Sequence, residues 1–243
     1  MTVDRIMSKL DEYLNKNDYA SAERHLLYWR DEAKRSGSKR TALLVESELI
    51  GLYRKLGRRD DALGAVSAAL SLIDEMGAGG QVGSATVYLN CATAYKAFGE
   101  TEKSLELFLT ARKIYEKELQ PNDARLAGLY NNMGLTLVDL GRFDEAKELY
   151  NKAIRLAAGT LDEAITYLNL ASAAEAEKGL LDSEEEIGEY LGIAENILEN
   201  YPKRDGYYAF VCEKCASVFG YYGRFLYEKE LRERAEKIYY EGT

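Results

Sequence analysis

The stretch LGRRDDAL at residues 56–63 decides the fold of this chain, because it recurs. It returns as FGETEKSL at residues 98–105 and again as LGRFDEAK at residues 140–147. In both steps the glycines Gly57, Gly99 and Gly141 stand 42 residues apart. A repeat of this length without strand signals predicts stacked pairs of helices, and such a stack offers an extended surface for binding.

The residues around each glycine predict two helices joined by a tight turn. Before Gly99, residues 85–98 carry apolar side chains at helical spacing, and a second amphipathic segment follows it. Glycine ends a helix well because it takes the left-handed conformation without steric cost. Small residues recur at two further positions, where the helices of a pair must approach closely: Ala62, Ser104 and Ala146 at one, and Ala69, Ala111 and Ala153 at the other.

These features resemble the tetratricopeptide repeat, which has small residues, a tyrosine and a hairpin glycine at set distances. The pattern is filled by Ala92, Tyr95, Gly99, Ser104, Phe108 and Ala111, and then by Gly134, Leu137, Gly141, Ala146, Tyr150 and Ala153. The period of 42, the segment YNNMG at 130–134 and Pro121 in the connecting loop look most like the kinesin-light-chain type. The resemblance implies a bacterial protein with an all-α fold, a right-handed superhelical α-solenoid.

We expect about six antiparallel helix pairs that form a single solenoid domain over residues 1–243. In the first pair Asn17 replaces the glycine, since Asn also takes the left-handed cap. The pairs are expected at approximately 3–38, 39–80, 81–122, 123–160, 161–203 and 204–243.

Composition limits the partners and the compartment. The formal net charge is −9, so a nucleic-acid backbone meets net repulsion, and no nucleic-acid partner is expected. The N-terminal residues lack the apolar stretch of a signal peptide, and no segment is apolar enough to cross a membrane. Three widely placed cysteines argue against a disulfide framework. We therefore expect a cytoplasmic protein without a membrane partner.

Asparagines recur on three of the predicted first helices. Aligning residues 88–90, 130–132 and 167–169 places Asn90, Asn132 and Asn169 at one position. Their amides offer both a donor and an acceptor, the pair needed to grip one peptide unit. In kinesin-light-chain-like and bacterial peptide-pheromone-receptor arrays, asparagines at this position hold a peptide backbone on the concave face, and the resemblance implies that role here. Alternatively, these amides bond a neighbouring helix and only order the stack.

Other residues near the row complete the candidate peptide-binding site. Asn131, Thr93, Lys96 and Arg54 are expected to shape specificity, while Glu46 and Glu48 depart from the row in the second pair. Cations such as Arg54 and Lys96 attract an acidic segment, or they simply complement the dipole at a helix C-terminus. The sequence leaves both interpretations open.

The residues of common catalytic and metal sites are scarce. His25 is the single histidine, which argues against a Ser-His-Asp triad and against zinc or di-iron sites. Cys212 and Cys215 form a lone Cys-x-x-Cys that is more simply two small buried hydrophobes. We expect no enzyme, no catalytic residues, no metal and no cofactor.

The function predicted from the sequence is a non-enzymatic scaffold that binds a protein or peptide segment. One alternative is the peptide-sensing domain of a bacterial regulator, and another is an architectural subunit of a larger assembly. The last pair is rich in aromatic residues, so homo-oligomerisation through exposed rings there is a further hypothesis: the rings are Tyr207, Tyr208, Phe210, Phe219, Tyr221, Tyr222, Phe225 and Tyr227.

Overall fold

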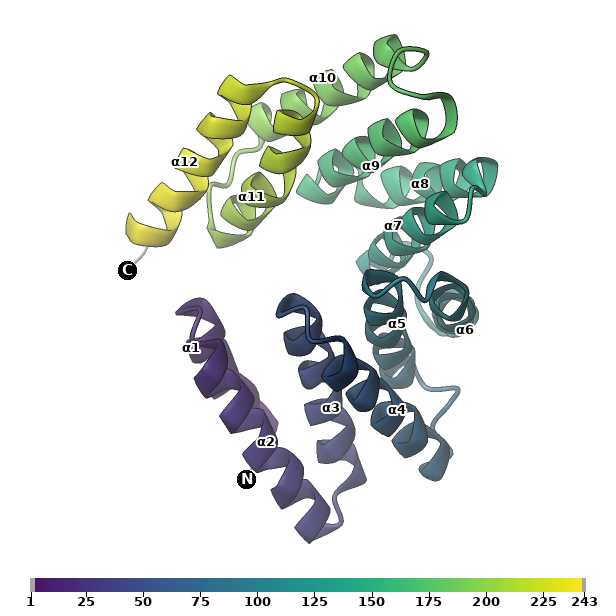
Figure 1. The fold of residues 1–243 in the computed structure, drawn as a ribbon, viewed down its shortest axis with the longest axis vertical. Coiled ribbons are helices and arrows are strands. Elements are labelled where there is room, and N and C mark those ends of the chain that lie inside the picture. Colours follow the sequence, from purple (N-terminus) through teal and green to yellow (C-terminus); the bar gives the residue numbers. More distant parts are fainter. Residues whose placement is uncertain (1–2, 242–243) are drawn as a thin grey trace. The chain divides into compact units, whose positions relative to one another are not determined.

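The computed structural model describes residues 3–241, and these residues form twelve α-helices and no strand (Figure 1). The chain divides into two compact units, unit 1 over Met1–Leu119 and unit 2 over Gln120–Thr243. Met1, Thr2 and residues 242–243, which the predicted domain includes, lie outside the described residues. Within residues 3–241, no helix has the length and apolar character that crossing a membrane requires.

Unit 1 contains three helix pairs. The first pair packs on the second through α2 and α3, whereas α5 packs against both α3 and α4. The six helices are α1 (Val3–Asn15), α2 (Tyr19–Ser36), α3 (Lys39–Lys55), α4 (Arg59–Glu75), α5 (Val82–Ala97) and α6 (Thr101–Glu118).

Unit 2 contains three more pairs. Its first helices α7, α9 and α11 pack side by side in that order, and each carries its second helix, α8, α10 or α12. The bounds are α7 (Ala124–Asp139), α8 (Phe143–Ala157), α9 (Leu161–Lys178), α10 (Glu184–Asn200), α11 (Gly206–Tyr221) and α12 (Phe225–Glu241). The predicted all-α fold of six helix pairs is confirmed.

The repeated glycine ends the first helix of the second, third and fourth pairs as predicted. Gly57, Gly99 and Gly141 have φ angles of +69°, +79° and +70°, in the left-handed region. The residue after each glycine donates its N–H back into the last helical turn, as Arg142 does to the Leu137 carbonyl at 2.8 Å. Asn17, which replaces the glycine in the first pair, has a φ of +54°. The recurring stretch therefore works as a helix stop.

The recurring small residues lie where two helices meet. All six at the two predicted positions are fully buried. At Gly134 a Cβ would lie 2.4 Å from Cε1 of Tyr150, so this position also demands a residue without a side chain. The ring of Tyr150 on α8 thus packs directly on the backbone of α7, and only glycine allows this approach.

Candidate functional site

The residues predicted to bind a peptide all lie on first helices, but they belong to both units. Unit 1 holds Arg54 at the end of α3 and Asn90, Thr93 and Lys96 on α5. Unit 2 holds Asn131 and Asn132 on α7 and Asn169 on α9. The predicted row therefore falls into two groups.

In unit 1, the side chain of Asn90 ties α5 to α3. Its Nδ2 donates to Oγ of Ser47 at 2.9 Å, and Ser47 is buried. The hydroxyl of Thr93 donates to the backbone carbonyl of Asn90 at 2.8 Å, within the same helix. Both side chains are half-buried, so each uses a polar group inside unit 1 while part of its surface stays accessible.

Arg54 and Lys96 occupy equivalent positions in the last turn of α3 and α5. Arg54 is exposed and Lys96 is half-buried. Positive charges at these helix ends are favourable to the helix dipole, which accounts for their placement without a ligand. Their role in attracting an acidic segment stays a prediction.

In unit 2, Asn131 is the centre of a buried polar network between α7 and α9. Its Nδ2 donates to Oγ1 of Thr166 at 2.8 Å, and its Oδ1 accepts from Nδ2 of Asn169 at 3.2 Å. The Thr166 hydroxyl in turn donates to the Asp162 carbonyl at 2.8 Å. Both ends of the Asn131 amide are therefore satisfied inside the protein.

Asn90 and Asn169 make the same contact in the two units. Each donates from Nδ2 to a side chain of the preceding pair, Ser47 for Asn90 and Asn131 for Asn169. In repeat register, Ser47 and Asn131 share one position. Asn90 and Asn169 therefore order the stack, as the alternative interpretation of the row expects. These bonds use only the Nδ2 atoms, and the Oδ1 atoms of both residues accept no hydrogen bond within residues 3–241.

Asn132 differs from the other two members of the row. Its Nδ2 donates to the Gly128 carbonyl at 2.8 Å, one turn back in its own helix. Asn90 and Asn169 donate to the repeat position that Ser47 and Asn131 occupy. One repeat before Asn132, the same position is Leu89, whose side chain has no hydrogen-bonding group. Asn132 is half-buried, and within the described chain its amide bonds no other helix. The identity of the residue one repeat back could have revealed this difference from the sequence.

A cavity in unit 1 brings together residues that the sequence analysis did not join. It has a volume of about 620 Å³ and is lined by residues of α2, α3 and α4. Glu46 of α3 lines it, is 6% exposed, and its Oε2 has no hydrogen-bond partner within the described residues. The sequence marks Glu46 only as a departure from the asparagine row, because the cavity depends on the spacing of three helices.

The remaining titratable candidates have structural surroundings. His25 Nε2 lies 3.0 Å from the Ile6 carbonyl, and its ring packs between Tyr13 and Trp29. Burial raises the pKa of the Cys212 thiol to about 11 and that of Cys215 to about 12, so both stay protonated at neutral pH. No group of three or more metal-ligating side chains occurs within residues 3–241.

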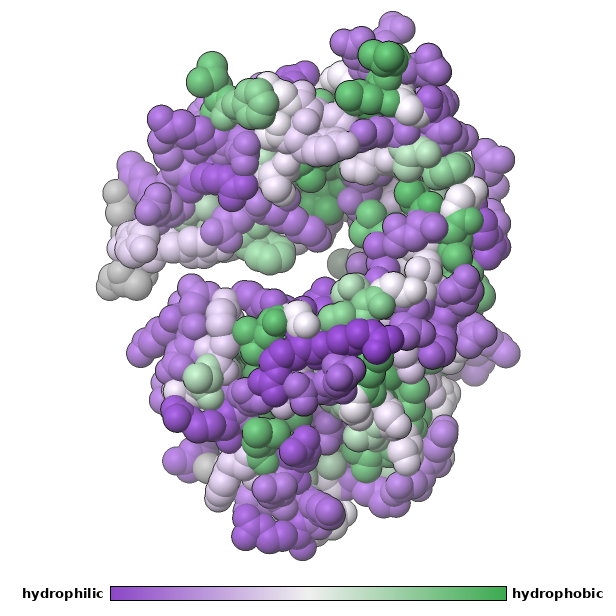
Figure 2. All heavy atoms as spheres, in the orientation of Figure 1, coloured by the Kyte–Doolittle hydropathy of each residue, from purple (hydrophilic) through white to green (hydrophobic). Residues whose placement is uncertain are grey.

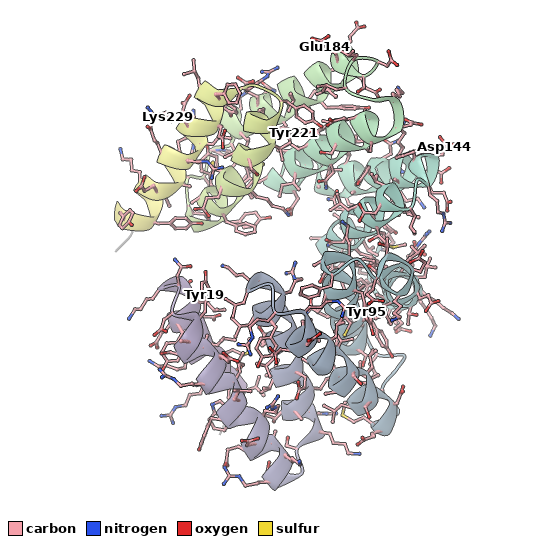
Figure 3. The ribbon with its side chains drawn as sticks, in the orientation of Figure 1. Tyr19, Tyr95, Asp144, Glu184, Tyr221 and Lys229 are labelled. Atoms are coloured by element: carbon pink, nitrogen blue, oxygen red, sulfur yellow. The ribbon has the colours of Figure 1, made fainter. Side chains whose placement is uncertain are left out.

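The aromatic residues of the last pair divide into core and surface. Tyr208 and Phe219 are fully buried, and Tyr222 and Tyr227 are partly buried. Tyr221, at the end of α11 in Figure 3, is exposed but donates its hydroxyl to Glu175 at 2.7 Å. Figure 2 shows hydrophobic side chains at the surface where α11 turns into α12; the exposed apolar residues of this pair are Tyr207, Phe210, Tyr221, Phe225, Leu226, Tyr239 and Tyr240.

Comparison with known families identifies the repeat. Family models of the tetratricopeptide repeat match residues 41–117 and residues 127–160. No curated protein matches the sequence. The two matched segments contain all three copies of the recurring stretch, so the resemblance drawn from the glycines and small residues is confirmed.

Solved structures with this architecture are similar over most of the chain. BtubC (BKLC) from P. vanneervenii has a TM-score of 0.69 at 21% identity, with 83% of this chain and 82% of that one covered. TPR-like repeats of the kinesin-light-chain type from Podosopora anserina give a TM-score of 0.67 at 16% identity, covering 80% and 94%. A Rap protein complexed with competence and sporulation factor gives 0.62 at 16% identity, covering 96% and 62%. At these identities the likeness shows the fold, a helical-repeat solenoid.

Proposed function

Because the chain carries tetratricopeptide repeats of the kinesin-light-chain-like kind, we propose that it is a non-enzymatic scaffold that binds a protein or peptide segment. The observation that carries the proposal is the amide of Asn132, which lies half-buried on the first helix α7 and bonds no other helix in the described chain. Turning this side chain toward a ligand costs one hydrogen bond within α7 and leaves the packing of unit 2 intact.

The neighbouring network supports the proposal by holding the site in place. Asn131 is fixed between Thr166 and Asn169, so the backbone that carries Asn132 does not have to become ordered when a ligand binds. An amide presents one donor and one acceptor, which match the carbonyl and N–H of a single peptide unit. Asn169 on the neighbouring helix α9 donates to Asn131, and its Oδ1 accepts no hydrogen bond within the described chain.

Unit 1 carries its own group of candidate residues. Asn90 keeps its Oδ1 as an acceptor, and Thr93 and Lys96 lie one and two turns further along α5. Arg54 and Lys96 give this region positive charge on a chain whose net charge is −9, which favours an acidic segment. We propose that in unit 1 Thr93, Lys96 and Arg54 select the ligand and that Asn90 holds its backbone.

The test separates binding from folding. A segment captured from lysate with the wild-type chain is synthesised as a labelled peptide, and its Kd is measured by fluorescence anisotropy. Asn132→Ala is expected to weaken binding at least tenfold, about 1.4 kcal/mol, with little change in the melting temperature. Asn131→Ala is the comparison for folding, because it removes the adjacent amide that joins α7 to α9 and is expected to lower the melting temperature. Unchanged affinity for Asn132→Ala would refute the site.

A sensory role is the second candidate, and the likeness to the Rap protein favours it because 96% of this chain is covered. In that case the bound peptide changes the shape of the chain in addition to occupying a binding site. Small-angle scattering with and without the captured peptide decides between the two roles. A scaffold keeps its radius of gyration, and a sensor changes it.

The third candidate, an architectural subunit, depends on the exposed rings of the last pair. Phe225 and Leu226 are 69% and 87% exposed at the start of α12. Self-association through this pair stays a prediction. Light scattering at tens of micromolar tests the self-association, and a monomeric mass would reject it. The cytoplasmic location also stays a prediction.

A further inference from the structure

The cavity of unit 1 has the features of a second binding site. It lies between α2 and α4, which both pack on α3, and α3 forms its floor. Lys39, Ala42 and Glu46 follow one another on α3 at spacings of three and four residues, so they share one face of the helix. Glu46 is the innermost of the three, since it is buried while Lys39 is exposed.

The walls of the cavity are apolar next to Glu46. Ala33 contributes from α2, Ala42 from α3, and Ala68 and Leu72 from α4. Three of these four side chains are single methyl groups, which leaves the space that larger residues would fill. A ligand that enters past them meets hydrocarbon first and the carboxylate of Glu46 at the end.

One oxygen of the buried Glu46 carboxylate makes no hydrogen bond in the described chain. This oxygen is Oε2, and a buried charge without a partner costs stability. Burial raises the pKa of Glu46, whereas the charge of Arg30 lowers it. A partner from outside that donates a hydrogen bond to Oε2 would remove this cost.

Charged side chains of both signs surround the entrance. Arg30, Asp31 and Lys34 line it from α2, and Lys39 of α3 is paired with Glu75 of α4 at 2.9 Å. The rim therefore carries three cations and two carboxylates, and Lys39 is already engaged by Glu75. Glu46 is the third carboxylate of the lining, and it is the only one of the three that is buried.

We propose that this cavity binds a long basic side chain, arginine or lysine, of a protein or peptide partner. The aliphatic stem lies along the alanines, and the cationic head donates to the carboxylate of Glu46. The proposal rests on the scaffold function for the origin of the side chain, but it uses a different site in a different unit.

The experiment uses the full chain and capped tripeptides as probes. Ac-Gly-Arg-Gly-amide and Ac-Gly-Lys-Gly-amide are titrated while the amide resonances of α2, α3 and α4 are followed by NMR. The matched probe replaces arginine by citrulline, which has nearly the same shape but no charge. We expect shifts at the cavity with the cationic peptides and at least tenfold weaker binding with citrulline.

Two variants complete the test. Glu46→Gln keeps the shape and is expected to weaken the arginine peptide at least tenfold, whereas Glu48→Gln, two residues along α3 and outside the cavity lining, leaves it unchanged. Equal binding to Glu46→Gln, or of the citrulline peptide, would overturn the proposal. It also fails if Glu46 proves to be the partner of Arg30, shown by a double-mutant cycle with strong coupling between the two. Loss of the Asn132 site would leave all these results unchanged.

Discussion

Unit 1 and unit 2 each bury a polar side chain on a first helix, and they treat it in opposite ways. In unit 2, Asn131 uses both ends of its amide, toward Thr166 and Asn169. In unit 1, Glu46 is equally buried but leaves Oε2 without a partner beside a cavity. Burial alone does not distinguish a structural polar residue from a functional one. The two kinds are distinguished by the hydrogen bonds that the residue makes inside the protein.

The difference has an energetic meaning. A buried amide with all its partners contributes to the unique packing of the two helices that it joins. A buried carboxylate without one lowers the stability of the chain that carries it, so it is kept where something else compensates the cost. The expected effects of substitution therefore have opposite signs in the two units.

The largest effect is expected for Asn131→Ala. The substitution leaves the Asn169 amide without its acceptor and removes the donor to Thr166, so unit 2 should lose about 2–3 kcal/mol. Urea denaturation followed by circular dichroism measures the loss. Asn132→Ala is the control one residue away, and it should change the free energy of unfolding by less than about 0.5 kcal/mol. Similar losses for the two variants would erase the distinction between them.

The sequence predicts the fold better than it predicts these partners. The 42-residue period, the left-handed glycines and the small residues are local signals, and each one recurs several times in the chain. The partner of an asparagine depends on the residue one repeat away and on how two helices are spaced. The sequence therefore places Asn90 and Asn169 on first helices and leaves open that they bond a neighbouring helix, but it does not identify Ser47 and Asn131 as the partners.

The cavity next to Glu46 was beyond sequence reasoning for a related reason. Its space arises because Ala33 and Ala68 come from two different helices that both pack on α3. Alanine in a helix is ordinary, and nothing in the sequence says that these two residues lie on opposite walls of one opening. The division of the chain after Leu119 likewise depends on contacts between helices.

A smaller effect is expected at Tyr150, a buried polar group of unit 2 without a partner. Its hydroxyl makes no hydrogen bond within the described chain, and burial raises its pKa. Tyr150→Phe should therefore raise the free energy of unfolding by about 1 kcal/mol. Tyr208→Phe is the matched control, because this fully buried hydroxyl accepts from Arg234 at 3.0 Å. Tyr208→Phe should lower the free energy of unfolding by a similar amount. If Tyr150→Phe lowers it as well, the Tyr150 hydroxyl has a hydrogen-bond partner and the prediction is wrong.

The smallest effect is expected from the pH dependence of Glu46→Gln. Burial holds the pKa of Glu46 above its value in the unfolded chain, although Arg30 faces it from α2 and opposes the shift. The folded chain therefore binds more proton than the unfolded chain over the range between the two pKa values. Raising the pH through that range removes stability from the wild type, and the penalty is complete above the folded pKa.

Glu46→Gln lacks this titration, so at pH 7 it should melt on the order of 1 °C higher than the wild type. The gain should vanish when the pH falls below about 4, where both states of the wild type carry a protonated Glu46. Glu106→Gln, at an exposed position of α6, controls for the loss of one negative charge. If Glu46→Gln melts lower than the wild type at pH 7, the carboxylate already has a stabilising partner inside the chain. The contrast between Glu46 and Asn131 would then disappear.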